Sequence, residues 1–300
     1  MFGIGWQIGG RPTAYLAAGL FALHPVILLN GRRAVQEGAL LFFGLLSALT
    51  GAVLAARRAR GAVSWYLWPA LAASCALALA SKHSALPFVA GALGWVFIAG
   101  CAQFKLRRIL ATAAALIVTG IMAGLGFIAL SPALWSDPPA RIGDLLQIRQ
   151  ELIDSQVAAF SDGPMPVQDR IAGVFTNPFL RPPQFFEAPA WAEYEPITQQ
   201  IQAYTASPLA GYSSGGIIGW MLTAAMILGG IGLYIPRWRP RRDWAPTLGL
   251  SVWTAITVIT LLLSPLDWQR YALPLLPEAV LFAAAGFTII GRWIVLRSKR

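Results

Sequence analysis

The sequence predicts an all-α polytopic membrane protein with about eight transmembrane helices and one long extracytoplasmic loop. Its 300 residues are 57% hydrophobic and only 12% charged, with a mean hydropathy of +0.61. A soluble domain is roughly half apolar and a quarter charged. Apolar windows of about 18 to 23 residues recur, each long enough to cross the ~30 Å hydrocarbon layer. The alternation of a transmembrane barrel is absent, so we expect the spans to be helices.

The apolar windows place the spans in order along the chain. They cover residues 13–30, 36–56, 65–81, 84–101, 109–131, 214–235, 246–263 and 273–291. We therefore expect an N-terminal group of five spans in residues 1–131, a loop or lid in residues 132–213, and a C-terminal group of three spans in residues 214–300.

The long connection contains two kinds of sequence. After Pro138 and Pro139, apolar residues recur at helical spacing; these are Ile142, Leu145, Leu146, Leu152, Ile153, Val157 and Phe160. This pattern predicts an amphipathic helix that lies along the membrane or covers a cavity. Prolines mixed with Phe and Trp follow, which favours an ordered, irregular lid.

The basic residues give an orientation. One side of the eight spans carries 15 of them: Arg11, Arg57, Arg58, Arg60, Lys105, Arg107, Arg108, Arg237, Arg239, Arg241, Arg242, Arg292, Arg297, Lys299 and Arg300. The other side carries 8: Arg32, Arg33, Lys82, Arg141, Arg149, Arg170, Arg181 and Arg270. By the positive-inside rule the first side is cytoplasmic, so both termini are expected in the cytoplasm of a multi-pass protein.

Arg32, Arg33 and Glu37 stand in a tight outer turn, where basic residues are disfavoured. One interpretation is that a guanidinium binds a phosphate through paired N–H donors, while Glu37 orients it or acts in chemistry. The alternative is an interfacial Arg–Glu pair that fixes the helical hairpin. Ionisable groups at the edge of a membrane favour the functional interpretation.

Other ionisable residues lie at the same side. Lys82 and His83 occupy a second outer turn, where lysine either binds phosphate or snorkels to the interface. Asp267, Arg270 and Tyr271 form the last outer turn.

Two further polar residues fall within or beside apolar spans. Glu278 lies inside the last span and should face a partner or a hydrated cavity. His24 precedes Pro25 and is at least as well explained by a hydrogen bond to a carbonyl as by a place in a cavity.

Several classes of function find no support. Cys75 and Cys101 lie in apolar spans without a CxxC spacing, so a zinc site is not expected, although outer carboxylates could hold Mg²⁺ or Mn²⁺ weakly. The net charge of +10 is spread over short loops without interleaved aromatics, which argues against nucleic acid as a partner. No P-loop, dinucleotide fingerprint or nucleophilic triad is present.

Four segments together resemble a known class of enzyme. They are AYLAAGLFALHPVILLNGRRAVQEGALLFFGLL, LALASKHSALPFV, SPALWSDP and DWQRYALPLLP. Their order and topology are similar to those of the lipid-carrier-dependent glycosyltransferases of the GT-C membrane class, in particular bacterial relatives of the dolichyl-phosphate-mannose–protein mannosyltransferases.

The resemblance implies transfer of a sugar from a polyprenyl-phosphate carrier to a protein, lipid or glycan acceptor, on the outer face of the cell (inner) membrane. No nucleotide is needed, and a divalent cation often assists. By this resemblance Arg32 or Arg33 and Arg270 would hold the carrier phosphate, with Lys82, His83 and Tyr271 nearby, and the loop 132–213 would cover the substrates.

The sequence departs from the family in one respect. In the family, the carboxylate that acts as the catalytic base lies in the first outer loop, between the first two membrane helices. No segment of this sequence corresponds to that loop. We expect either an N-terminally incomplete chain, which we favour, or a base supplied by Glu37 or by an acid of the long loop. A lipid or polyanion transporter and a non-catalytic membrane subunit are the alternatives, although the inverted repeats of many transporters are not found.

Overall fold

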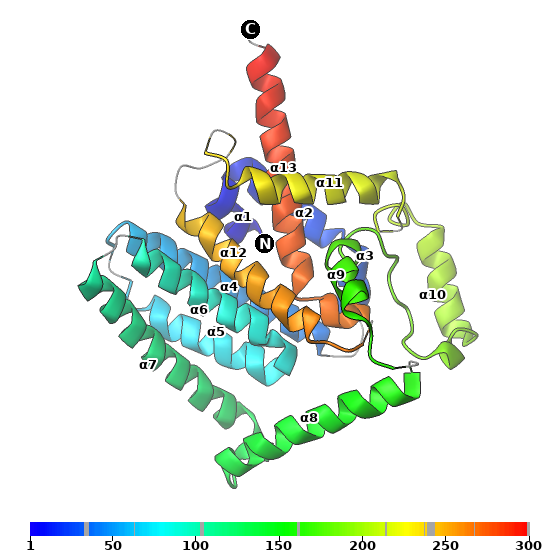
Figure 1. Ribbon diagram of the computed structural model, residues 1–300, viewed down its shortest axis with the longest axis horizontal. Coiled ribbons are helices and arrows are strands. Elements are labelled where there is room, and N and C mark those ends of the chain that lie inside the picture. Colours follow the sequence, from blue (N-terminus) through cyan, green and yellow to red (C-terminus); the bar gives the residue numbers. More distant parts are fainter. Residues whose placement is uncertain are drawn as a thin grey trace.

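The computed structural model describes residues 1–32, 36–62, 64–102, 105–160, 163–213, 215–236, 238, 244–266 and 268–298. These residues form helices and connections without a strand, which confirms the all-α polytopic class. The apolar helices are α2 (Arg11–Ala22), α3 (Pro25–Arg32), α4 (Glu37–Ala59), α5 (Leu67–Ser81), α6 (Leu86–Cys101), α7 (Leu106–Leu130), α11 (Ile217–Gly232), α12 (Ala245–Leu262) and α13 (Leu275–Ser298). Figure 1 shows most of them gathered in one bundle.

The helices match the predicted spans in position but differ in length. Among the described residues, 5 helical segments are long and apolar enough to cross a membrane: α4, α6 with the turn before it, α7, α12 and α13. Helices α2 and α3 are bent by 55° relative to each other at the break before Pro25. If this bent pair counts as one span, the number of candidate spans among the described residues rises to 6. Helices α5 and α11 occupy the two remaining predicted spans, but their 15 and 16 residues are fewer than the ~20 that a full crossing needs.

The long connection is more helical than expected. The predicted amphipathic helix is present as α8 (Pro138–Phe160), which runs along one edge of the molecule in Figure 1. The proline-rich part, expected to be irregular, contains α9 (Val167–Thr176) and α10 (Glu195–Thr205). Pro166 precedes α9 and Pro196 lies in the first turn of α10, because proline fits the start of a helix, where no backbone donor is lost.

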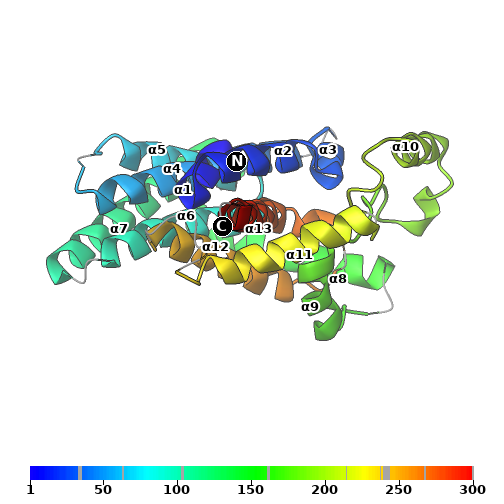
Figure 2. The same ribbon diagram turned by 90° about the horizontal axis from the view of Figure 1, so that it is seen from above.

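Helix α13 runs through the middle of the bundle. Figure 2 views it end-on between α2 and α11, and both helices pack against it. Thr13 of α2 and Thr288 of α13 join their hydroxyl groups by a buried hydrogen bond of 2.8 Å. The short α1 (Phe2–Gly9) packs against α2 and α4. Helix α6 is a second centre, in contact with α4, α7 and α12.

Large rings packed onto glycines join α6 to α12. A Cβ atom at Gly91 of α6 would overlap the Trp253 ring, and one at Gly249 of α12 would overlap the Trp95 ring. Both tryptophans are fully buried. Small residues allow such close approach between membrane helices, where packing replaces the hydrophobic effect as the source of association.

Helices α11 and α13 approach each other even more closely, which allows a direct test. A Cβ atom at Gly229 would overlap the carbonyl oxygen of Phe282, whereas one at Gly230 would meet nothing within 4 Å. We predict that Gly229→Ala lowers the free energy of unfolding by about 1–3 kcal/mol through overpacking. The neighbouring Gly230→Ala should be neutral or stabilising by up to about 1 kcal/mol, because alanine is the better helix former. Thermal unfolding of the purified protein in detergent measures both; equal melting temperatures for the two variants would contradict the contact.

Candidate functional site

A polar pocket of about 360 Å³ lies at the end of the bundle that carries the long connection, which we call the loop end. Segments far apart in sequence converge there: α3, the start of α4, α8, residues 187–191 and the turn before α13. The residues that line the polar pocket are Asn30, Glu37, Gln156, Phe160, Glu187, Ala188, Trp191, Trp268 and Arg270. Two of the predicted site residues, Glu37 and Arg270, therefore share one cavity.

Glu37 is the first residue of α4, where the helix dipole favours a negative side chain. It is buried, and its Oε1 atom forms an ion pair with Lys82 from the turn between α5 and α6. Its Oε2 atom is also buried and has no hydrogen-bond partner among the described residues. Lys82 thus fixes one oxygen of Glu37. The other oxygen remains a hydrogen-bond acceptor, and Glu37 lines the polar pocket.

Arg270 is held by aromatic rings and by one carboxylate. Its guanidinium lies 4.5 Å from the centroid of the Trp268 ring, and its Nη1 atom is 3.8 Å from Oε1 of Glu187. The rings of Trp268 and Tyr271 stack with an interplanar angle of 4°, and Tyr271 donates a hydrogen bond of 3.3 Å to Oε1 of Gln156 on α8. The Nε atom of Arg270 is buried and has no partner in the described part of the chain.

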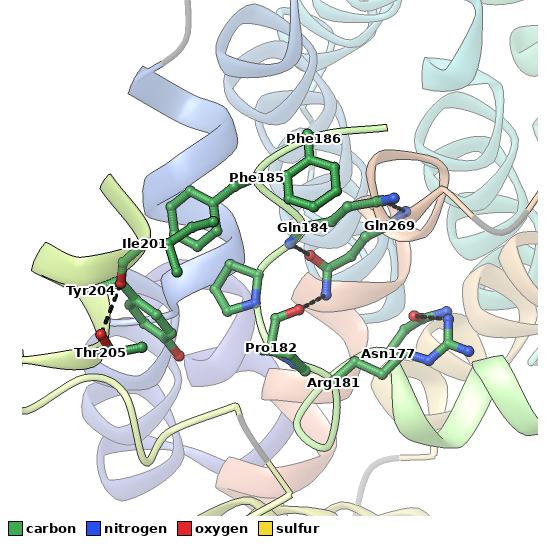
Figure 3. A pocket seen from close by; sticks show the side chains of 11 residues that line it. Asn177, Arg181, Pro182, Gln184, Phe185, Phe186, Ile201, Tyr204, Thr205 and Gln269 are labelled. Atoms are coloured by element: carbon green, nitrogen blue, oxygen red, sulfur yellow. Dashed lines mark hydrogen bonds between the residues drawn. The ribbon is translucent and has the colours of Figure 1, made fainter. Parts of the chain in front are cut away.

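A pair of glutamines fixes the turn that carries Arg270. The backbone N–H of Gln184 donates to Oε1 of Gln269, and the backbone N–H of Gln269 donates to Oε1 of Gln184, each at 2.8 Å. Gln269 also donates from Nε2 to the carbonyl oxygen of Pro182 at 3.1 Å. This brace ties the long connection to the turn before α13, and it is drawn in Figure 3.

The side chains drawn in Figure 3 line another hollow, which has a volume of about 500 Å³ and includes Gln184 and Gln269 in its wall. It lies among Asn177, Arg181, residues 182–186 and one face of α10. Burial raises the pKa of the Tyr204 hydroxyl there, so this group is a neutral donor at pH 7. It donates to the carbonyl oxygens of Leu209 and Ala210, both at 3.3 Å.

An apolar pocket of about 290 Å³ adjoins the polar one. It lies between α8 and the bundle, and Tyr271 forms part of its wall beside Arg270. Its lining comprises His83, Ser84, Leu86, Pro87, Leu146, Arg149, Ile153, Thr257, Thr260, Leu261, Leu263, Ser264, Pro265, Leu266, Tyr271 and Pro274. His83 and Arg149 are the basic residues among the described residues of this lining. The predicted site residue His83 therefore borders the apolar pocket and not the polar one.

The other predicted residues do not line either pocket. His24 is buried at the bend between α2 and α3, where its Nε2 atom is 2.7 Å from the carbonyl oxygen of Pro178. Glu278 is buried within α13 and accepts a hydrogen bond of 2.6 Å from Thr257. Arg32 is exposed at the end of α3. Arg33 and Asp267 lie outside the described residues, so their part in the site stays a prediction.

Several residues of the site were missed by sequence reasoning. Gln156, Glu187 and Trp191 come from the long connection, and no local pattern marks them. Trp268 and Gln269 belong to the segment DWQRYALPLLP, where their proximity to Arg270 was the available signal.

The described residues contain no group of three or more His, Cys, Asp or Glu that could hold a metal ion. Glu37 and Glu187 are each paired with a basic side chain instead. Dependence on Mg²⁺ or Mn²⁺ stays a prediction.

Comparison with known proteins relates the N-terminal part of the chain to one family. The apolar helices indicate a multi-pass membrane protein. Residues 1–132 match the family model of the dolichyl-phosphate-mannose-protein mannosyltransferases, which confirms the resemblance over α1 to α7. Neither the curated proteins nor the solved structures contain a match to this chain.

The ion pair between Glu37 and Lys82 makes a prediction about stability. Removal of one partner leaves the buried carboxylate uncompensated, so Lys82→Met should cost about 2 kcal/mol, less than a fully buried pair because Lys82 is partly exposed. The double variant Lys82→Met with Glu37→Gln should recover much of that loss. A double-mutant cycle of unfolding free energies measures the coupling; a coupling near zero would show that the pair contributes nothing.

Proposed function

We propose that this protein transfers a sugar from a polyprenyl-phosphate carrier to a hydroxyl group of an acceptor at the loop end. One observation carries the proposal. An acceptor atom, Oε2 of Glu37, and a donor atom, Nε of Arg270, are both buried without a partner among the described residues, and both residues line the same cavity. A buried polar atom without a hydrogen bond destabilises the protein unless a ligand supplies the missing partner. A hydroxyl group of the acceptor could donate to Oε2 of Glu37, and a phosphate oxygen of the donor could accept from Nε of Arg270.

The proposed reaction is a single displacement at the anomeric carbon. The acceptor oxygen forms a bond to that carbon as its proton passes to Glu37, and the bond from the carbon to the phosphate oxygen breaks. The electron pair of the broken bond stays on the carrier phosphate, whose charge Arg270 stabilises. Lys82 acts as a positioning residue, because its ion pair directs one oxygen of Glu37 away from the reaction.

The apolar pocket is the proposed site for the first part of the carrier chain. Helix α8 borders both pockets, with Gln156 on the polar one and Leu146, Arg149 and Ile153 on the apolar one. A donor with its phosphate at Arg270 would place its apolar chain between α8 and α12. The orientation from the basic residues, with the loop end outside the cell membrane, belongs to this proposal, as does a protein, lipid or glycan acceptor.

The proposed chemistry can be tested at Glu37 and Arg270. Glu37→Gln should lower turnover about 10²–10⁴-fold and leave donor binding nearly unchanged, because a general base acts in the transition state. Arg270→Gln should raise the donor KM about 10- to 100-fold through loss of a charged hydrogen bond. The assay is release of polyprenyl phosphate from mannosyl-phospho-polyprenol by membranes that contain the full chain.

Arg141→Gln is the matched control, because Arg141 is exposed on α8 and pairs with Asp144 at 3.4 Å. It should leave both constants unchanged. If Glu37→Gln and Arg270→Gln both keep full turnover, these residues are not catalytic. If the wild-type chain releases no polyprenyl phosphate, a non-catalytic subunit becomes the better interpretation.

The proposed carrier groove predicts dependence on chain length. Thr260→Trp should fill the apolar pocket and raise the KM for a long-chain donor about tenfold, the effect of two methylene groups kept out of it. A short-chain donor analogue should be unaffected. Ile259→Trp is the control, since Ile259 is exposed on the same helix and does not line the pocket. Equal effects on long and short donors would place the chain elsewhere.

A further inference from the structure

Helix α9 exposes apolar side chains that a helix in water would bury. Val167, Ile171 and Phe175 recur every four residues, so they lie on one side of the helix. They are 61%, 48% and 50% exposed. A surface helix usually turns such a stripe toward the core and its polar residues toward water. We call this exposed stripe the α9 ridge.

The two other sides of α9 have evident surroundings. One side packs against α12, where Arg170 and Gly173 border a small gap together with Leu261. Another side carries the exposed polar residues Gln168 and Asp169, which are suited to water. The ridge lies between these two sides. A helix with a protein-facing, a water-facing and an exposed apolar side is typical of a helix that lies in a membrane surface.

Helix α10, in the same long connection, shows the usual pattern of a helix in water. Its apolar residues Ile197 and Ile201 are half-buried, while Gln199, Gln200 and Gln202 are exposed. The exposed apolar stripe is therefore a property of α9 and not of the connection as a whole.

Arg170 attaches α9 to the end of a candidate membrane span. Its Nη1 atom donates to the carbonyl oxygen of Leu262 at 2.9 Å, and its Nε atom donates to the carbonyl oxygen of Met165 at 2.7 Å. Leu262 is the last residue of α12, which is long and apolar enough to cross a membrane. A cation at the C-terminus of a helix is favoured by its free carbonyl groups and its dipole. Helix α9 is thus held at the level where α12 ends.

Exposed apolar side chains also occur on both helices next to α9. At the end of α12, Ile259 and Leu263 are 59% and 75% exposed. The chain that follows α9 packs on the first turn of α11, where a Cβ atom at Gly219 would overlap the carbonyl oxygen of Phe179. Trp220 in that turn is exposed as well, as is typical of aromatic residues at the interface between membrane and water. Figure 2 shows α9 at the margin of the bundle, beyond α11.

We propose that α9 lies in the surface of the membrane at the loop end, with its ridge in contact with the acyl chains of the adjacent leaflet. The bilayer is the proposed occupant because the ridge adjoins the exposed apolar ends of α11 and α12, which lipid covers in a membrane-spanning bundle. This contact would hold residues 177–186, which lead from α9 to the glutamine pair, at a fixed height above the membrane. The inference does not depend on the reaction proposed for the polar pocket.

The test attaches a nitroxide label to single cysteines of the full chain in phosphatidylcholine vesicles. Cys75→Ala/Cys101→Ala first removes the native free thiols. Ile171→Cys then places the label on the ridge, and Phe175→Cys repeats the measurement one turn later. Electron paramagnetic resonance compares collisions with oxygen, which dissolves among acyl chains, and with a water-soluble nickel chelate. We expect the collision rate with oxygen to exceed that with nickel at both positions.

Asp169→Cys is the matched control, because Asp169 is exposed on the same helix and points about 160° around its axis from Ile171. Nickel should collide more often than oxygen with a label there. The same nickel preference at position 171 would mean that water covers the ridge, which would overturn the proposal. A label at position 171 that neither reagent reaches would show that a second copy or another protein segment covers the ridge, and would overturn it too.

A second measurement needs no substitution. An apolar diazirine reagent is allowed to enter the hydrocarbon layer of vesicles that contain the wild-type chain, and mass spectrometry locates the label after photolysis. We expect label on α9 and none on α10. Equal labelling of both helices, or of neither, would contradict the membrane contact. This measurement decides the proposal even where a cysteine variant fails to fold.

Discussion

The ion pair between Glu37 and Lys82 is the interaction on which the loop end depends. A carboxylate buried at the start of a membrane helix is strongly unfavourable unless a cation meets it. Lys82, in the turn between α5 and α6, supplies this cation. The ion pair therefore fixes the hairpin of α3 and α4 relative to the hairpin of α5 and α6. Since only one oxygen of Glu37 is used, the same pair leaves an acceptor at the polar pocket.

The long connection completes the site with side chains such as Gln156, Glu187 and Trp191, and hydrogen bonds hold it to the bundle. The crossed hydrogen bonds of Gln184 and Gln269 hold it against the turn before α13. Helix α8 has no fully buried residue, so its apolar side chains are available to a pocket or a membrane surface. The same helix thus borders both the polar and the apolar pocket.

The basic side chains at the loop end are held within the protein. Lys82 and Arg270 have carboxylate partners from other segments of the chain. Arg270 also lies against the ring of Trp268. These contacts fix the positions of both cations before any ligand is present.

The sequence by itself determined the helical class, the positions of the apolar helices and α8. These follow from hydrophobic runs and from a 3.6-residue period, which are local properties that any window of the chain displays. It also singled out Glu37, Lys82 and Arg270, because ionisable residues in short turns between apolar helices are costly without a purpose.

Only the tertiary structure decided which of these residues meet. It joined Glu37 to Lys82 and brought Glu187, Gln156 and Trp191 to Arg270. It also gave His24 and Glu278 hydrogen bonds in positions that do not line either pocket. It also showed α5 and α11 to be shorter than full spans, and it found helices in the proline-rich segment. Contacts between residues far apart in the sequence depend on how helices pack. Packing in turn depends on the shapes of whole helix surfaces, which no local pattern records.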